Sequence, residues 1–225
     1  MTQLDYKIHI DEVITRIEAA RLKVNDHHIV KIVAVSKYNT AEDVKALYEI
    51  GQRAFGENRV QDLAAKSEAL DELPLEWHFI GNLQKNKINQ LIGLNPSMFQ
   101  SLDSLELARA LQERLLNRGD YTMETLLQIN TAKEANKSGV MPEEAADLYA
   151  QISEECPNIH LKGVMTIGAH TDDQTVIRKS FEDTRKIYES IEGASICSMG
   201  MSGDFELAIE CGSNMVRLGS LMFPK

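Results

Sequence analysis

A lysine ends the apolar run IVAVSK, residues 32–37, near the start of the chain. The run has two interpretations. The chain can simply return to water at this point, so that the ammonium of Lys37 is a solvated strand end. Alternatively, an amine that is held partly out of water has a lowered pKa and can attack a carbonyl carbon to form a Schiff base. The run by itself leaves both interpretations open.

Two glycine-containing stretches near the C-terminus have the composition of an anion site. They are residues 198–204, SMGMSGD, and residues 217–220, RLGS. Glycines let backbone amides approach a ligand, and Ser202 as the N-cap of a following helix would leave free N–H groups at a positive helix end. The same residues could also do no more than turn the chain, because Asp204 and Glu206 already complement the helix dipole.

These residues stand at the ends of regularly alternating segments. Apolar spacing predicts an amphipathic helix over residues 4–24, and a β-branched run predicts a buried strand over residues 29–35. Thr40, with Asp43 at the third helical position, predicts a helix that ends at Gly51. The alternation continues with strands over 53–55, 76–80, 97–100, 124–130, 160–167, 194–198 and 215–218, and with helices over 59–70, 84–92, 104–118, 142–155, 174–190 and 204–211.

Eight strands, seven of them followed by a helix, favour an α/β fold of the closed (β/α)8 kind over an open doubly wound sheet. The N-terminal helix is expected to pack near the gap where an eighth helix would lie. No linker rich in Pro, Gly or Ser interrupts the pattern. We therefore expect residues 1–225 to form a single domain.

In a parallel barrel the C-terminal ends of all strands meet on one face, and the loops after the seventh and eighth strands commonly hold a phosphate. Lys37 would face the same opening. A phosphorylated aldehyde satisfies both features. It could be a sugar phosphate, as in Schiff-base aldolases, or pyridoxal 5′-phosphate (PLP), and residue types alone do not separate the two.

The composition limits the possible partners. A formal net charge of −10 argues against a nucleic-acid backbone or an anionic membrane surface. Cys156, Cys197 and Cys211 are too scattered for a disulfide framework, and no residues have metal-ligand spacing, so we expect a reducing cytoplasm and no metal. The N-terminus lacks a signal-peptide apolar region, and no apolar run approaches the ~18 residues of a membrane span. A monomer is the default expectation.

Five stretches, in this order, resemble the YggS/PROSC family of pyridoxal phosphate homeostasis proteins: IVAVSK, FGENRVQD, EWHFIGNLQKNK, LKGVMTIG and CSMGMSGDFELAIECGSNMVRLGS. Together they span residues 32–220, which is nearly the whole chain. The resemblance implies a TIM barrel like the barrel domain of fold-type III alanine racemases, with an extra N-terminal helix. It also implies PLP as the cofactor, held through a lysine aldimine and without an established turnover reaction.

Carried over to this chain, the resemblance implies that Lys37 forms the covalent aldimine and that Arg217 faces the pyridine nitrogen. The phosphate would be held by Ser202, Gly219 and Ser220, with Met201 and Gly203 alongside and with Asn58 and His78 near the ring. Asn58 with Gln61 could instead form a capping box, and His78 could be a satisfied interior histidine. The family's last strand reads RxGTAIFG where this chain has RLGSLMFPK, which leaves the C-terminal packing open.

The resemblance also bears on activity. A guanidinium opposite the pyridine nitrogen keeps the ring neutral, and a neutral ring is a weak electron sink. In the resembled racemases a second base comes from another domain of the partner subunit. This chain ends at Lys225, so we expect one face of the cofactor to be open to water.

We therefore expect a carrier that buffers PLP and contributes to vitamin B6 and to amino- and keto-acid homeostasis, with apo PLP-dependent enzymes as possible recipients. The alternatives are a weak PLP-dependent amino acid racemase, a Schiff-base aldolase and a purely structural barrel. Lys133 and Lys137 in AKEANKSG are other lysines that could serve, but their polar neighbours predict a solvated segment.

Overall fold

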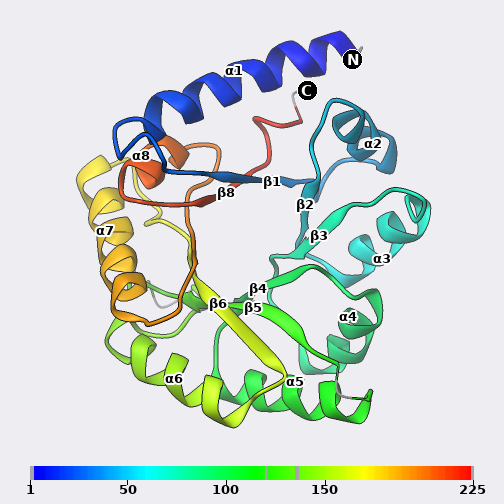
Figure 1. Cartoon of the computed structure of the whole chain (residues 1–225), viewed down its shortest axis with the longest axis vertical. Helices are drawn as coiled ribbons and strands as arrows, with labels where there is room; N and C mark the ends of the chain where they lie inside the picture. The colour runs from blue at the N-terminus through cyan, green and yellow to red at the C-terminus, as the bar shows by residue number, and fades with distance from the viewer. Residues whose placement is uncertain (1–2, 120, 135–136, 224–225) are drawn as a thin grey trace.

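The computed structural model describes residues 3–119, 121–134 and 137–223, in which eight parallel strands form a closed ring (Figure 1). The strands are β1 (Lys31–Val35), β2 (Ala54–Glu57), β3 (Glu76–Phe79), β4 (Met98–Leu102), β5 (Met123–Ile129), β6 (Ile159–Thr166), β7 (Ile196–Ser198) and β8 (Met215–Leu218). The ring closes because β1 pairs with both β2 and β8, with Ala34 opposite Leu218. The predicted TIM barrel is confirmed.

Helices surround the ring of strands. They are α1 (Gln3–Arg21), α2 (Ala41–Glu49), α3 (Val60–Ala69), α4 (Ile88–Leu94), α5 (Leu105–Asn117), α6 (Ala145–Glu155), α7 (Gln174–Ser190) and α8 (Phe205–Glu210). Short 3-10 helices, η1 (Lys85–Lys87) and η2 (Pro142–Glu144), lead into α4 and α6 where the sequence predicted continuous helices. Thr40 is the N-cap of α2, as predicted, and it forms a capping box with Asp43.

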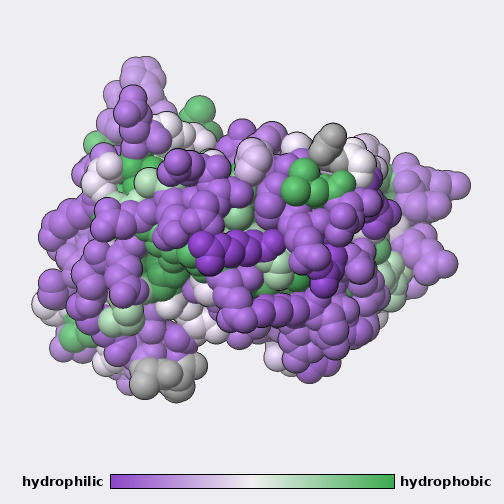
Figure 2. Space-filling model, turned by 90° about the horizontal axis from the view of Figure 1, so that it is seen from below, coloured by the Kyte–Doolittle hydropathy of each residue, from purple (hydrophilic) through white to green (hydrophobic). Residues whose placement is uncertain are grey.

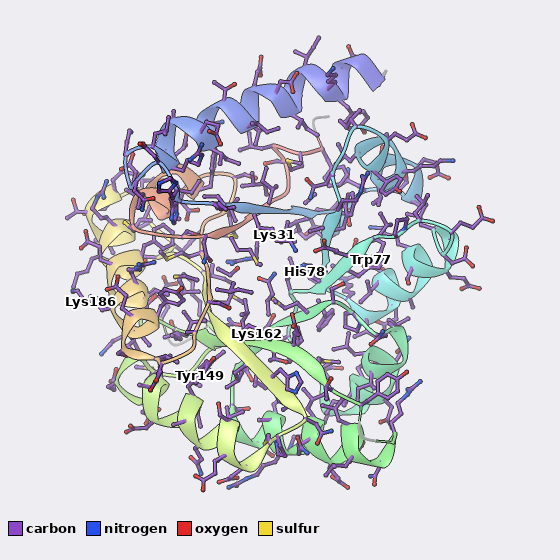
Figure 3. The ribbon with its side chains drawn as sticks, in the orientation of Figure 1. Lys31, Trp77, His78, Tyr149, Lys162 and Lys186 are labelled. Carbon is purple, nitrogen blue, oxygen red and sulfur yellow. The ribbon has the colours of Figure 1, made fainter. Side chains whose placement is uncertain are left out.

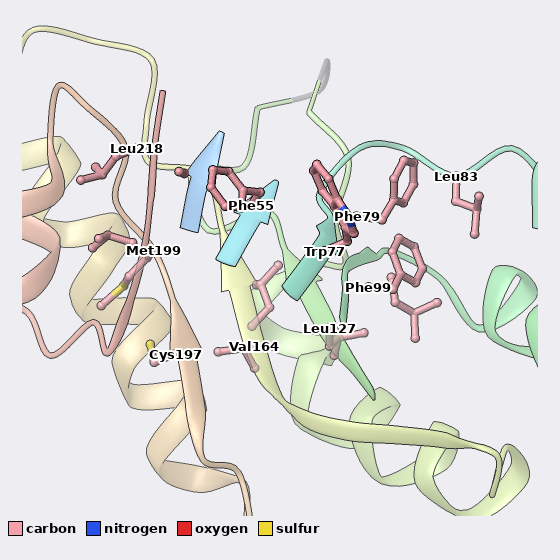
Figure 4. Close-up of a cluster of buried hydrophobic side chains, with 14 of the residues drawn as sticks. Phe55, Trp77, Phe79, Leu83, Phe99, Leu127, Val164, Cys197, Met199 and Leu218 are labelled. Carbon is pink, nitrogen blue, oxygen red and sulfur yellow. The ribbon is translucent and has the colours of Figure 1, made fainter. Parts of the chain in front are cut away.

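The alternation of side chains along each strand divides the core into two layers. The inner layer fills the barrel, and its apolar part consists of Val33, Ala54, Met98, Leu126, Met165 and Met215. The outer layer lies between the strands and the helices, and Figure 4 shows part of it. There Phe55 packs against Trp77 with ring centroids 5.9 Å apart, and Phe79 packs against Phe99 at 5.8 Å. The barrel is therefore a packed core, and only its ends can bind a ligand.

Helix α1 takes the place of the eighth outer helix, as predicted. It lies between α8 and α2 in Figure 1 and buries one face that includes Val13 and Ile17. Arg16 of α1 forms a bidentate ion pair with Glu206 of α8, with its Nε 2.7 Å from Oε1. On the other side, Tyr6 donates a hydrogen bond to Asp43 of α2. Helix α1 thereby covers β8 and β1, the strands that close the barrel.

The surface over α5 and α6, which Figure 2 shows, is mainly hydrophilic, and its hydrophobic areas are small and separated by polar side chains. Among the described residues, no helix combines the length and the apolar character that crossing a bilayer requires.

Candidate binding site at the barrel mouth

The mouth of the barrel is the end at which the strands reach their C-termini, and Lys37 stands at its edge. Strand β1 ends at Val35, and the carbonyl oxygen of Ser36 then accepts a hydrogen bond from Asn39 N at 2.8 Å. Lys37 is therefore the first central residue of a turn. Val33 points into the barrel, and alternation along β1 directs Val35 toward the same axis, whereas Lys37 lies in the turn beyond the strand.

The predicted partial desolvation of Lys37 is wrong in this structure. Its side chain is exposed, and its Nζ lies 5.0 Å from the ring centroid of Tyr38, which is itself 85% exposed. The reason is the turn, which carries Lys37 beyond the last layer of packed strand residues. The amine therefore stands at the opening of the barrel and can be reached from solvent.

The loops after β7 and β8 lie side by side next to the end of β1. Ser202 Oγ accepts a hydrogen bond from Gly219 N at 3.2 Å. A Cβ on Gly219 would lie 3.7 Å from the Val35 carbonyl oxygen, so this loop packs against the strand that leads to Lys37. The structure thus brings together two of the predicted anion-binding loops and the predicted lysine.

Ser202 is not the N-cap of α8. Asp204 occupies that position, and its Oδ1 accepts from Met201 N at 2.6 Å, so the carboxylate already occupies one amide of the loop. Burial raises the pKa of Asp204, while the Met201 amide acts in the opposite direction. The Ser202 hydroxyl is directed instead toward the loop that follows β8.

Several donors in these two loops are unpaired. Within the described part of the chain, the backbone N–H groups of Ser202, Gly203 and Ser220 have no hydrogen-bond acceptor. Gly203 and Ser220 are exposed, and no atom lies within 4 Å of a Cβ built on Gly203. Unpaired and accessible amides in adjoining loops fit a phosphate group, because such a group accepts several hydrogen bonds. Met201, in the loop after β7, is 40% exposed.

Arg217 lies below these loops, inside the barrel. It is only 4% exposed, and its guanidinium donates to Ser198 Oγ and to the Thr166 carbonyl oxygen, each at 2.7 Å. Burial lowers the pKa of Arg217 to about 10, and the nearby Asp204 carboxylate opposes this shift. Arg217 therefore remains protonated at neutral pH.

A chain of hydrogen bonds runs from Arg217 across the barrel to His78. Ser198 Oγ donates to Gln100 Oε1 at 2.8 Å, and Gln100 Nε2 donates to His78 Nδ1 at 2.8 Å. His78 lies inside the ring of strands, whereas its neighbour Trp77 lies on the outer side (Figure 3). We call Arg217, Ser198, Gln100 and His78 the interior chain.

His78 is an interior histidine that is satisfied only in part. Its Nδ1 is hydrogen-bonded, but its Nε2 is buried without a partner among the described residues. Burial lowers the pKa of His78 to about 4, so the imidazole is neutral at neutral pH. Gln100 was not among the predicted site residues, although it is the one amide side chain in the otherwise mostly apolar strand MFQSL.

Asn58 follows β2 at the mouth but does not cap a helix. The N-cap of α3 is Arg59, without a side-chain hydrogen bond, so the suggested capping box of Asn58 with Gln61 is wrong. The backbone of Asn58 instead packs closely against Gly81. The two lie so close together that a Cβ at Gly81 would be only 2.0 Å from the Asn58 carbonyl oxygen. Asn58 is thereby fixed against the loop that follows β3.

Two cavities open on the opposite side of the mouth, at the ends of β5 and β6. The larger has a volume of about 680 Å³ and reaches Met201, Gly203 and Asp204, so it is continuous with the anion loops. The smaller has a volume of about 220 Å³. Lys137 lines both cavities.

The prediction that Lys137 is solvated is wrong. Its side chain is 18% exposed, and its Nζ binds Glu134 Oε1 and the Gly168 carbonyl oxygen, each at 2.8 Å. Lys133, in contrast, is solvated as expected, with a side chain that is 56% exposed. Residues 135 and 136 of this segment lie outside the described part of the chain.

The barrel and its mouth match a known class of proteins. Residues 8–224 match the family model described as "Alanine racemase, N-terminal domain". A pyridoxal phosphate homeostasis protein from Helicobacter pylori is 56% identical over 220 residues, which cover 98% of this chain and 99% of that protein. This chain belongs to the family of pyridoxal phosphate homeostasis proteins.

Solved structures agree with this assignment. A protein of unknown function from Bifidobacterium adolescentis superposes with a TM-score of 0.91 at 33% identity, covering 98% of this chain and 95% of that one. PipY from Synechococcus elongatus, solved with PLP bound, superposes with a TM-score of 0.79 at 30% identity, covering 92% of this chain and 98% of that one.

Proposed function

We propose that this protein binds PLP at the mouth of the barrel, that Lys37 holds it covalently, and that the protein carries and buffers the cofactor. The observation that carries the proposal is that the loops with the unpaired amides of Ser202, Gly203 and Ser220 pack against Val35, two residues before Lys37. PipY, which is 30% identical, has been solved with PLP bound, and the Helicobacter pylori relative is named for PLP homeostasis.

Different residues would contact different parts of PLP. The unpaired amides and the hydroxyls of Ser202 and Ser220 would hold the phosphate, and Gly219 would let the backbone come close to it. Arg217 would face the ring nitrogen and, because it stays protonated, would leave that nitrogen unprotonated. When bound, the cofactor supplies an aldehyde that bonds reversibly to amines. His78 and Asn58 would lie on the side of β2 and β3.

A carrier is favoured by the exposure of the lysine. Lys37 and the neighbouring Tyr38 are open to solvent, so an amine or a water molecule can reach the site of attachment. We infer that bound PLP can be released to apo PLP-dependent enzymes, and that the protein affects amino- and keto-acid pools indirectly. Cys156, Cys197 and Cys211 are unpaired and buried, which suits the reducing cytoplasm in which we place a monomeric carrier.

Titration with PLP tests the proposal. Addition of PLP to the apo protein should produce a visible absorbance band, and Lys37→Ala should lose that band. Lys45→Ala, which removes an exposed lysine of the neighbouring helix α2, is the matched control and should behave like the wild type. Loss of the band in the control, or its persistence in Lys37→Ala, would refute covalent attachment at Lys37.

The carrier function has its own test. The PLP-loaded protein is mixed with an apo transaminase, and the recovery of transaminase activity is followed. We expect recovery that is faster than with the same amount of PLP attached to an unrelated protein. A protein that racemises amino acids at a rate near ~1 s⁻¹, the low end of ordinary turnover, would instead be an enzyme.

A further inference from the structure

A largely buried ion pair lies on the outer side of the barrel wall and contacts Ser36, the residue before Lys37. Glu57, the last residue of β2, is fully buried, and its Oε1 lies 2.5 Å from Nζ of Lys66 in α3. The same carboxylate oxygen accepts from the Ser36 hydroxyl at 2.6 Å, and Lys66 Nζ also donates to the Ser36 carbonyl oxygen at 2.6 Å. We call Ser36, Glu57 and Lys66 the Ser36 clamp.

All three polar groups of Ser36 are hydrogen-bonded, and the clamp holds two of them, the hydroxyl and the carbonyl. The Ser36 amide donates to the Gly56 carbonyl oxygen at 3.0 Å, which extends the β1–β2 ladder by one residue. The Ser36 carbonyl, which Lys66 binds, is also the acceptor of the turn that contains Lys37. The clamp therefore fixes the start of that turn.

Lys37 depends on this backbone for its direction. Among the described residues, its ammonium contacts the exposed ring of Tyr38 and forms no hydrogen bond or ion pair. A side chain without polar partners points where its backbone directs it. Whatever fixes the turn therefore also fixes the approach of the amine to the mouth.

Stability alone gives little reason for such a pair. Removing two charges from water costs several kcal/mol per ion, and well-packed apolar residues are often as stable in the same place. The second carboxylate oxygen, Oε2 of Glu57, is buried without a hydrogen-bond partner among the described residues, which adds to that cost.

We propose that Glu57 and Lys66 are positioning residues that hold the Lys37 turn in the geometry needed to capture an aldehyde at the barrel mouth. This inference rests on the proposed attachment of PLP to Lys37. Neither residue contacts the mouth itself, since both act through Ser36 from the side of α3. A purely structural ion pair would stabilise the docking of α3 and leave the reactivity of the folded protein unchanged.

The test uses a charge-balanced double variant, Glu57→Gln with Lys66→Met, because a single substitution would leave an unpaired buried charge. Gln112→Leu is the control, since it removes a buried amide that binds Asn158 far from β1. Lys66→Arg is a second variant that keeps the charge and several donors.

The first readout needs no cofactor. Amide hydrogen exchange at Asn39, whose N–H closes the turn, should accelerate about tenfold or more in the double variant, because its acceptor is no longer fixed. It should remain near the wild-type rate in the control and in Lys66→Arg. Equal exchange in the double variant and the control would overturn the inference.

The second readout is the rate at which the apo protein captures PLP covalently, measured on the folded fraction. We expect the double variant to be roughly ten- to a hundredfold slower, the cost of a misplaced nucleophile, with unchanged affinity for pyridoxine phosphate, which lacks the aldehyde. An unchanged rate of PLP capture in the double variant would overturn the inference about Glu57 and Lys66 but not the proposed function. Absence of capture at Lys37 in the wild type would overturn the proposed function, and the exchange experiment would still decide whether the clamp fixes the turn.

Discussion

At the scale of single residues, the hydrogen bonds inside the barrel have a fixed direction because Arg217 can only donate. Ser198 accepts from Arg217, so its own hydroxyl hydrogen goes to Gln100 Oε1. The amide nitrogen of Gln100 then donates to His78 Nδ1, and neutral His78 carries its hydrogen on Nε2. These hydrogen bonds thus link the cation on β8 to the histidine on β3.

Breaking the interior chain at Gln100 tests this coupling. Gln100→Leu leaves His78 Nδ1 and the Ser198 hydroxyl without their partner, and each buried unsatisfied group costs about 1–3 kcal/mol. In the double variant Gln100→Leu with Ser198→Ala, the loss of free energy of unfolding should be smaller than the sum of the two single losses by about 0.5–3 kcal/mol. Urea unfolding measures these losses. Gln112→Leu combined with Ser198→Ala should be additive. Additivity in both pairs would show that the chain is not coupled.

The low pKa of His78 predicts a pH dependence of stability. In the folded state the pKa is lowered to about 4, whereas the ordinary value is 6.5, so between these values the unfolded state binds the additional proton. The contribution of neutral His78 to the free energy of unfolding is complete above pH 6.5 and is lost as the pH falls toward 4. At about 1.4 kcal/mol per pKa unit the loss is roughly 3 kcal/mol.

His78→Gln is the comparison for this prediction. Its free energy of unfolding should fall less steeply than that of the wild type between pH 6.5 and 4, because glutamine does not titrate. Parallel curves for the two proteins would show that His78 is not held neutral in the folded state.

At the scale of elements, α1 is the part of the fold that makes this barrel complete. It lies over β8, which carries Arg217, and over β1, which leads to Lys37, so its packing supports the site indirectly (Figure 1). Ile17 lies on the buried face of α1 and is 4% exposed, whereas Ile14 is 42% exposed.

These two isoleucines give a matched pair of variants. Ile17→Ala should lower the free energy of unfolding by about 2–5 kcal/mol, because it leaves a cavity between α1 and the barrel. Ile14→Ala should change it by less than about 0.5 kcal/mol. Urea unfolding measures both, and equal losses would mean that α1 does not pack as described.

The elements were predictable from the sequence because apolar periodicity reports which side of a segment is buried. The run before Lys37, for example, predicts β1, and Thr40 with Asp43 predicts the start of α2. The hydrogen-bond partners of single side chains were harder to predict. Gln100 and Ser198 are 98 residues apart, and no local pattern connects them.

Loop geometry limited the prediction of the site. Ser202 and Asp204 are both good N-cap residues, and packing against the loop after β8 decides between them. Lys137 has polar neighbours in the sequence, yet Glu134 and Gly168 bury it at the mouth. Such outcomes depend on contacts that form only after the barrel has closed.

At the scale of the whole molecule, ligand binding and folding are linked. A ligand that binds only the folded state raises the free energy of unfolding by about 2.7 kcal/mol when its free concentration is a hundredfold above Kd. We expect PLP to stabilise the wild type more than Lys37→Ala at equal concentration. Pyridoxine phosphate should stabilise both proteins equally, since it lacks the aldehyde and uses only the phosphate and ring contacts, and unequal stabilisation would mean that Lys37→Ala has altered those contacts.

The central claim is that the lysine at the end of β1 is the point of attachment. Borohydride reduction of the PLP-loaded protein, followed by digestion and mass spectrometry of the peptides, tests it most directly. The account predicts the reduced pyridoxyl group on Lys37, in near-stoichiometric amount. A label found predominantly on Lys137, or on any other lysine, would contradict the account.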